Sequence, residues 1–123
     1  MDYLDFFNKL KTVDSRIEFS LVERKLDSLE AIPNFYNIIN PQNVEFEFND
    51  GIIRLASYEE LALLKKYYPY ISDVCIFATC NGEPVYIKNS MVYTCVYGGG
   101  RIIEEKLAES IESLFINVSN SLE

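Results

Sequence analysis

The residue types that most often carry enzyme chemistry are sparse in this sequence. It contains three cysteines, Cys75, Cys80 and Cys95, and no histidine. A nucleophilic thiol or hydroxyl needs a base within hydrogen-bond reach. Without histidine, Cys80 or Ser90 would depend on a lysine, and Lys88 is the one close in sequence. We therefore predict that the chain is not an enzyme, and that its cysteines are small buried hydrophobic residues in a reducing compartment.

Two further motifs have a chemical and a structural interpretation. Gly98-Gly99-Gly100 lies between a predicted strand and a predicted helix, where a phosphate-binding loop could sit, but no Lys-Ser or Lys-Thr follows. The adjacent Glu59 and Glu60 could form an acid/base pair, yet they occupy the first turn of a predicted helix, where carboxylates favour the helix dipole. A metal site would need more ligands at short, regular spacing. We predict a flexible connector, helix capping, no metal and no cofactor.

Acidic and tyrosine side chains form a different candidate set. Tyrosine mixed with carboxylates is expected where a basic, aromatic or arginine-rich partner docks. For any single tyrosine, a simpler explanation is a ring in the core with its hydroxyl in water. The candidate partner-binding residues are Glu45, Glu47, Asp50, Tyr67, Tyr68, Asp73, Glu83, Tyr86, Tyr93 and Tyr97.

Size and charge indicate one acidic domain. The chain has 123 residues, 49% of them hydrophobic, enough for a single domain over residues 1–123. Its net charge of −8 disfavours nucleic acid and anionic membranes and favours basic partners, although acidity can also serve solubility. The segment Met1–Phe7 carries acids where a signal peptide carries bases, and the apolar runs are far below the roughly 18 residues of a membrane span. We expect a cytoplasmic protein.

Hydrophobic spacing, capping boxes and proline positions predict five helices. Ser-x-x-Glu capping boxes begin two of them, at Ser20 and Ser57. Pro33 suits a helix first turn, and Pro41 and Pro69 each end a helix. The predicted helices span residues 2–11, 20–29, 33–39, 57–68 and 103–118.

Apolar runs rich in β-branched and aromatic residues predict about five strands. Turns at Asn49–Gly51 and Asn81–Gly82 connect some of them. The predicted strands are Val44–Phe48, Ile52–Leu55, Val74–Thr79, Pro84–Lys88 and Met91–Tyr97. The fold class is therefore α+β, with a mostly antiparallel sheet, a hairpin plus a three-stranded meander, flanked by helices. The edge Val44–Phe48 could pair two copies, but its two glutamates are typical of edge protection, so we expect a monomer or weak homodimer.

Several motifs in the carboxyl-terminal half follow the order and spacing of one protein family. They are Leu55-Ala-Ser-Tyr-Glu-Glu-Leu61, Ile76-Phe-Ala-Thr-Cys-Asn-Gly-Glu-Pro-Val-Tyr86, Val92-Tyr93, Tyr97-Gly98 and Ala108-Glu-Ser-Ile-Glu-Ser-Leu-Phe115. With these motifs the chain resembles the SUKH superfamily, which includes a fungal cell-wall-synthesis regulator and many bacterial toxin-immunity proteins.

The resemblance covers residues 55–118 and is weaker before them. Ile32-Pro33 and Tyr36 match a family helix, but Asn40 is followed by Pro41 where members often have Asn-Gly-Gly. Tyr97 stands where members often place histidine. The resemblance implies an α+β domain with helices flanking an antiparallel sheet, and a function in binding.

The leading hypothesis from the sequence is an immunity protein that neutralises a cognate toxin by direct binding. An acidic chain suits a basic toxin, such as a nuclease domain, because complementary charge speeds encounter and selects the partner. The alternative is a regulatory scaffold or ligand-binding domain of the cell-wall-synthesis-regulator type, with no toxin partner. Neither hypothesis involves nucleic acid or membrane as a partner.

Overall fold

The computed structural model describes residues 1–24 and 32–122. Helices and strands follow one another along the chain as α1 (Tyr3–Val13), β1 (Glu18–Leu21), the 3₁₀ turn η1 (Asn34–Asn37), β2 (Ile39–Phe48), β3 (Gly51–Leu55), the 3₁₀ turn η2 (Tyr58–Glu60), α2 (Leu61–Tyr67), β4 (Cys75–Cys80), β5 (Glu83–Lys88), β6 (Met91–Gly98), β7 (Arg101–Ala108) and α3 (Ile111–Ser121). No helix among the described residues is long and apolar enough to cross a membrane.

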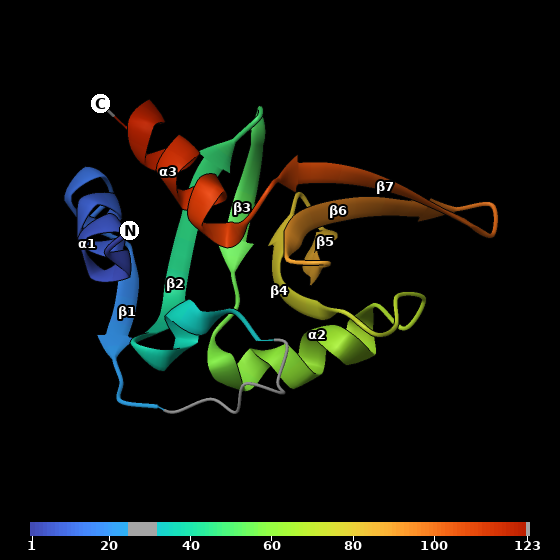
Figure 1. Cartoon of the computed structure of the whole chain (residues 1–123), viewed down its shortest axis with the longest axis horizontal. Helices are drawn as coiled ribbons and strands as arrows, with labels where there is room; N and C mark the ends of the chain where they lie inside the picture. The colour runs from blue at the N-terminus through green and yellow to red at the C-terminus, as the bar shows by residue number, and fades with distance from the viewer. Residues whose placement is uncertain (25–31, 123) are drawn as a thin grey trace.

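The described strands form one seven-stranded sheet in chain order, β1 to β7 (Figure 1). Every neighbouring pair is antiparallel. The prediction of an α+β fold with an antiparallel sheet is confirmed. The predicted number of about five strands was too low, because β1 and β7 were assigned to other structures.

Two hydrophobic clusters lie on opposite faces of the sheet. The larger one joins α1 and α3 to β2 through aromatic rings, among them Phe6 stacked on Phe115 at 4.4 Å between centroids. The smaller one contains Ile76 and Tyr86, whereas the preceding residue of β5, Val85, belongs to the larger cluster. Since successive strand residues point to opposite faces, β5 separates the two clusters.

Two predicted helix starts are confirmed by their caps. The Asp2 side chain accepts hydrogen bonds from the backbone N–H groups of Leu4 and Asp5 at the start of α1. At the predicted start of the helix after β3, Ser57 and Glu60 form a reciprocal capping box, and the 3₁₀ turn η2 leads into α2. Both ends follow the rule that side-chain oxygens satisfy free N–H groups.

Two other predicted helices were wrong in the part of the chain that the structure describes. Ser20 lies inside β1, where Phe19 packs against the larger cluster; residues 25–29 of that predicted helix lie outside the described residues. The helix predicted over 33–39 is only the turn η1, and β2 begins at Ile39. Pro41 lies within β2 at a bulge opposite Phe19, a position where a strand tolerates a residue without an N–H donor.

The helix predicted over 103–118 was also wrong in its first half. Residues Arg101–Ala108 form β7, and α3 starts only at Ile111, capped by the Ser110 side chain. Gly99 and Gly100 have φ angles of 59° and 75°, which return the chain onto β6 as a hairpin. The predicted flexible connector is therefore a tight turn.

Candidate functional site

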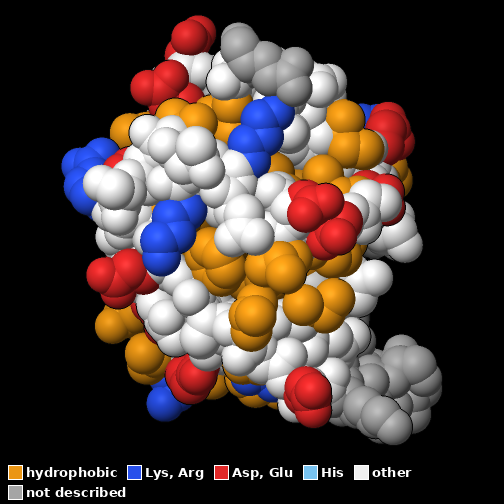
Figure 2. Space-filling model, turned by 90° about the vertical axis from the view of Figure 1, so that its left-hand side faces the viewer, with side chains coloured by type: hydrophobic (Ala, Val, Ile, Leu, Met, Phe, Trp, Pro, Cys, Tyr) orange, Lys and Arg blue, Asp and Glu red, His pale blue; other side chains and the backbone are white. Residues whose placement is uncertain are grey.

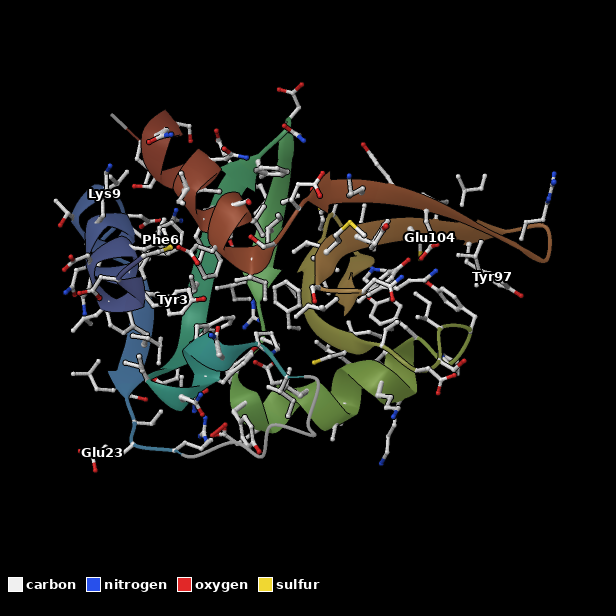
Figure 3. All side chains as sticks on the ribbon, in the orientation of Figure 1. Tyr3, Phe6, Lys9, Glu23, Tyr97 and Glu104 are labelled. Carbon is white, nitrogen blue, oxygen red and sulfur yellow. The ribbon has the colours of Figure 1, made fainter. Side chains whose placement is uncertain are left out.

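Five tyrosines gather on the face of β4–β6 that carries the smaller hydrophobic cluster. Tyr86 and Tyr93 are cross-strand neighbours with ring centroids 6.1 Å apart. Tyr97, two alternate positions further along β6, stacks on Tyr70 at 4.4 Å. Tyr68 meets Tyr70 edge-on at 6.2 Å. We call Tyr68, Tyr70, Tyr86, Tyr93 and Tyr97 the tyrosine face; Figure 3 labels Tyr97.

The loop after α2 brings two of these rings to the sheet. The Tyr68 hydroxyl donates a hydrogen bond to the Gly82 carbonyl at 2.8 Å, which ties the end of α2 to the β4–β5 turn. Ile71 is buried in the smaller cluster and anchors the loop between them. Asp73 takes a left-handed φ of 63° just before β4 and is exposed. The loop is thus held at both ends, with Tyr70 between the anchors.

A short hydrogen-bond chain runs across the tyrosine face. The buried Tyr86 hydroxyl donates to Glu104 Oε2 at 2.5 Å, and Lys88 Nζ lies 3.0 Å from Glu104 Oε1. Burial and the bond to Glu104 raise the pKa of Tyr86 well above its usual range. The bonds from Tyr86 and Lys88 lower the pKa of Glu104. At neutral pH the phenol is therefore a proton donor to a carboxylate.

The cysteines are not activated for nucleophilic attack. Cys95 is buried, as predicted, whereas Cys75 and Cys80 are only half-buried. Burial raises the pKa of Cys75 to about 11 and also raises the pKa values of Cys80 and Cys95. A thiol with a raised pKa stays protonated near neutral pH, and the thiolate is the reactive form.

A small open cavity lies beside the hydrogen bonds that join Tyr86, Glu104 and Lys88. Its volume is about 290 Å³, and Tyr70, Tyr86, Lys88, Ile102 and Glu104 are among its lining residues. Its lining is partly apolar or aromatic and partly charged, with both signs of charge present. Such a cavity can accept a side chain of a partner, with the polar groups setting its orientation.

The β6–β7 hairpin extends this surface beyond the body of the sheet (Figure 1). On the side of Tyr97, the cross-strand neighbour Ile102 is exposed. On the opposite side, Val96 faces Ile103, which is 69% exposed. A projecting hairpin with apolar side chains on both faces is typical of an interaction surface.

The structure brings some of the predicted binding residues together and separates others. Tyr68, Tyr86, Tyr93 and Tyr97 share the tyrosine face, and Glu83 begins β5 close to Tyr68 and Tyr70. Elsewhere lie Glu45 and Glu47 in β2, Asp50 in the β2–β3 turn, the exposed Tyr67 at the end of α2, and Asp73 before β4.

Sequence reasoning missed Tyr70, Lys88, Ile102 and Glu104. Glu104 was hidden by the wrong helix prediction, whereas Ile102 lay just before that helix and in no predicted element. In the observed register Glu104 lies opposite Cys95, and alternation along β6 then places it on the face that holds Tyr93 and Tyr97.

The adjacent glutamates have different structural roles. Glu60 accepts a hydrogen bond from the Ser57 N–H at 3.0 Å, which confirms its capping role. Glu59 instead accepts both bonds of the Asn40 amide group, at 2.8 and 3.1 Å. Asn40 is buried and also accepts from the Tyr58 N–H, so Glu59 fixes β2 against η2.

Comparisons of this chain with protein-family models, with curated proteins and with solved structures give no significant match in any of the three. The resemblance to the SUKH superfamily therefore depends on the sequence motifs alone. Within the described residues, no three Cys, Asp or Glu side chains are grouped so that they could hold a metal ion.

Proposed function

We propose that this chain is a non-catalytic binding protein of the immunity type, which masks a cognate protein toxin by docking through the tyrosine face and the β6–β7 hairpin. The observation that carries the proposal is the projecting hairpin, where Tyr97 and Ile102 are exposed beside Tyr70 and the open cavity. Tyrosine, together with tryptophan and arginine, is enriched among the residues that dominate binding energy at protein interfaces.

The charge of the chain selects the kind of partner. The net charge of the chain is −8, whereas β7 itself is balanced, with Arg101 and Lys106 beside Glu104 and Glu105. Apolar contacts would supply most of the affinity, while the negative charge of the chain as a whole would speed encounter with a basic toxin and disfavour acidic proteins. The mechanism is steric: the bound domain covers the toxin surface that its substrate must reach.

The test requires a toxin-like protein that is encoded next to this chain. Co-expression should protect cells from that toxin, and titration calorimetry should detect a complex of the two purified proteins. Tyr97→Ala should weaken the complex by more than about 30-fold, the change that 2 kcal/mol represents. The matched control is Ile116→Ala, which truncates an exposed apolar side chain on α3 and should leave affinity unchanged.

The same experiments define the contrary result. An absence of both protection and complex formation would refute the proposal and favour the regulatory scaffold without a toxin partner. A complex that Tyr97→Ala and Ile116→Ala weaken equally would place the docking surface elsewhere.

A further inference from the structure

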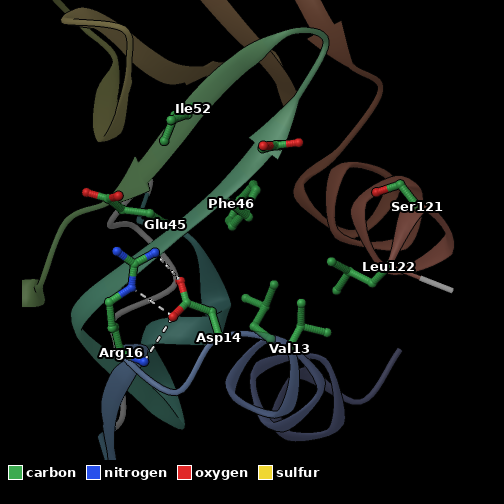
Figure 4. A pocket seen from close by; sticks show the side chains of 10 residues that line it. Val13, Asp14, Arg16, Glu45, Phe46, Ile52, Ser121 and Leu122 are labelled. Carbon is green, nitrogen blue, oxygen red and sulfur yellow. Dashed lines mark hydrogen bonds and ion pairs between the residues drawn. The ribbon is translucent and has the colours of Figure 1, made fainter.

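A second surface lies at the opposite end of the sheet, where β2 is longer than its neighbour. In the described chain β1 pairs with β2 only as far as Asn43, so residues 44–48 of β2 have a strand partner on the β3 side alone. Before β1 the chain turns, with the Ile17 N–H bonded to the Asp14 carbonyl at 3.1 Å. A cavity of about 600 Å³ occupies the space beside this open half-edge (Figure 4).

Alternation along the β2–β3 ladder directs the backbone groups of two residues of the open half-edge away from β3. Ile52, opposite Glu47, directs both its backbone groups to Asn81: its N–H to Oδ1 at 3.1 Å, and its carbonyl to the N–H at 3.3 Å. Glu47 and Ile52 are therefore a non-hydrogen-bonded pair of the β2–β3 ladder. By the same alternation, the N–H and C=O groups of Glu47 and Glu45 point away from β3, where an added strand would bond them.

The cavity spans both sides of the strand edge. Its inner wall includes Leu10 and Val13 of α1, Leu122 after α3, and Phe46 of β2. Val13 is 59% exposed although it belongs to this apolar wall (Figure 4). Its outer wall carries the side chains of Glu45, Glu47 and Ile52. A strand laid along the edge would therefore alternate between apolar contacts inward and acidic contacts outward.

Charge identifies the outward side chains of such a strand. The lining includes the acids Asp14, Glu45 and Glu47 and the base Arg16. Arg16 is already bonded to Asp14, with Nε and Nη2 each 3.0 Å from a carboxylate oxygen. The last residues of α1 and α3 also line the cavity, and helix carboxyl termini carry partial negative charge. Lysine or arginine would be favoured there.

A second copy of the chain fits this edge poorly. An antiparallel pairing of two β2 edges centred on Phe46 would place Glu45 of one copy opposite Glu47 of the other. Like charges directly opposite each other across a ladder are destabilising. The two glutamates thus discourage self-pairing while they attract a basic strand.

We propose that this half-edge and cavity bind an extended segment of a partner protein, in which apolar residues alternate with lysine or arginine, as an added β-strand. Figure 2 views the molecule from the side of α1, the helix whose carboxyl end lines this cavity, and shows both acidic and basic side chains on that side. The site is separate from the tyrosine face, and it stands whether or not the partner is a toxin.

The experiment uses the full chain and a blocked peptide of about seven residues, a usual strand length, that alternates valine and arginine. Fluorescence anisotropy should show saturable binding of this peptide, and a valine–glutamate peptide should not bind. N-methylation of the two peptide amides that face β2 should weaken binding by about tenfold, because it removes two of the ladder donors. Hydrogen exchange should show the amides of Glu45 and Glu47 becoming about tenfold better protected, while that of Phe46, already paired to β3, is unchanged.

Matched variants separate the groove from general acidity. The double variant Glu45→Gln/Glu47→Gln should weaken peptide binding about fivefold and flatten its salt dependence. Glu105→Gln on β7 and Tyr97→Ala should leave peptide binding unchanged. Because Tyr97→Ala tests toxin binding separately, a negative result with the peptide does not bear on the proposed toxin complex. Absence of peptide binding, or binding without protection of Glu45 and Glu47, would overturn the proposal. Protection of both amides without peptide, together with a dimer in sedimentation, would overturn it in favour of a second copy.

Discussion

Tyr97 stacks almost parallel on Tyr70, with ring centroids 4.4 Å apart and planes inclined by 13°. This contact joins the β6–β7 hairpin to the loop after α2. Tyr70 is in turn placed by Tyr68, whose hydroxyl is bonded to the β4–β5 turn. The orientation of the proposed docking surface therefore depends on a contact between rings that are distant in sequence.

The first prediction concerns the strength of that contact. A double-mutant cycle with Tyr70→Ala and Tyr97→Ala, measured by urea unfolding, should give a coupling energy of about 0.5–1.5 kcal/mol, as for other aromatic pairs. The control cycle replaces Tyr70→Ala by Tyr67→Ala, because Tyr67 is 70% exposed at the end of α2. Equal coupling in the two cycles would contradict a specific Tyr70–Tyr97 interaction.

The second prediction concerns acid stability. The pKa of Glu104 lies below its ordinary value of 4.5, because Tyr86 and Lys88 bond its carboxylate. A carboxyl group whose pKa is lower in the folded state stabilises the fold above about pH 4.5, and this stabilisation is lost as the pH falls through the folded-state pKa. Between about pH 6 and pH 3, the free energy of unfolding should therefore fall less steeply for Glu104→Gln than for the native chain. The matched control is Glu105→Gln, which removes the neighbouring exposed carboxylate and leaves both bonds to Glu104 in place.

The third prediction concerns alkaline stability. Tyr36 is buried, its hydroxyl donates to the Ala56 carbonyl at 2.6 Å, and burial raises its pKa well above 10.0. Tyr36→Phe should lower the free energy of unfolding at neutral pH by about 1–2 kcal/mol, because a buried acceptor loses its partner. A raised folded-state pKa means that stability is present below pH 10 and is lost as the pH rises further.

Above pH 10, where unfolded tyrosine ionises, Tyr36→Phe should therefore lose stability less steeply than the native chain. The control is Tyr67→Phe, which removes the hydroxyl of an exposed tyrosine and leaves the bond from Tyr36 to Ala56 in place. If the two variants follow the same alkaline curve, Tyr36 is not the group that titrates on unfolding.

Local signals in the sequence were sufficient wherever neighbouring residues complete the structure. The hairpin of β2 and β3, the meander β4–β6 and the capping box at Ser57 all have their partners within a few residues, and all were predicted. Asn and Gly at the turns adopt positive φ, as such residues do readily.

The failed predictions concern segments whose structure is decided by distant contacts. In residues 101–108, charged residues lie beside Ile102 and Ile103, a spacing that suits a helix face. These residues nevertheless form a strand, because they pair with β6. The double glycine between apolar runs was a usable hairpin signal. Ser20 resembles a helix cap, yet pairing with Asn40 in β2 makes it a strand residue.

Distant contacts also explain why the sequence revealed only part of the candidate site. Four tyrosines of the face were candidates from composition, because tyrosine mixed with acidic residues suggests docking, although Tyr86 is buried. Glu104 could not be placed without the register of β7, and Tyr70 could not be placed without the path of the loop after α2.

The last prediction concerns the junction between the two hairpins. A Cβ on Gly51 would lie 2.9 Å from Asn81 Nδ2 and 3.0 Å from Cys80 Sγ. Asn81 bonds the Ile52 backbone and so connects β3 to the β4–β5 turn. Gly51→Ala should therefore cost about 1–3 kcal/mol in urea unfolding, as overpacking does. Gly98→Ala is the control, because a Cβ there meets nothing within 4 Å.

Repeating Gly51→Ala in a variant that lacks the Asn81 side chain tests whether that side chain is what the new Cβ contacts. Asn81 has a φ of 52°, so Asn81→Gly keeps the turn conformation while removing the amide that the new Cβ would contact. Gly51→Ala should then cost less in the Asn81→Gly background than in the native chain, since only Cys80 Sγ remains in the way. The same cost in both backgrounds would show that the contact with Asn81 does not limit the packing of β3 against β4.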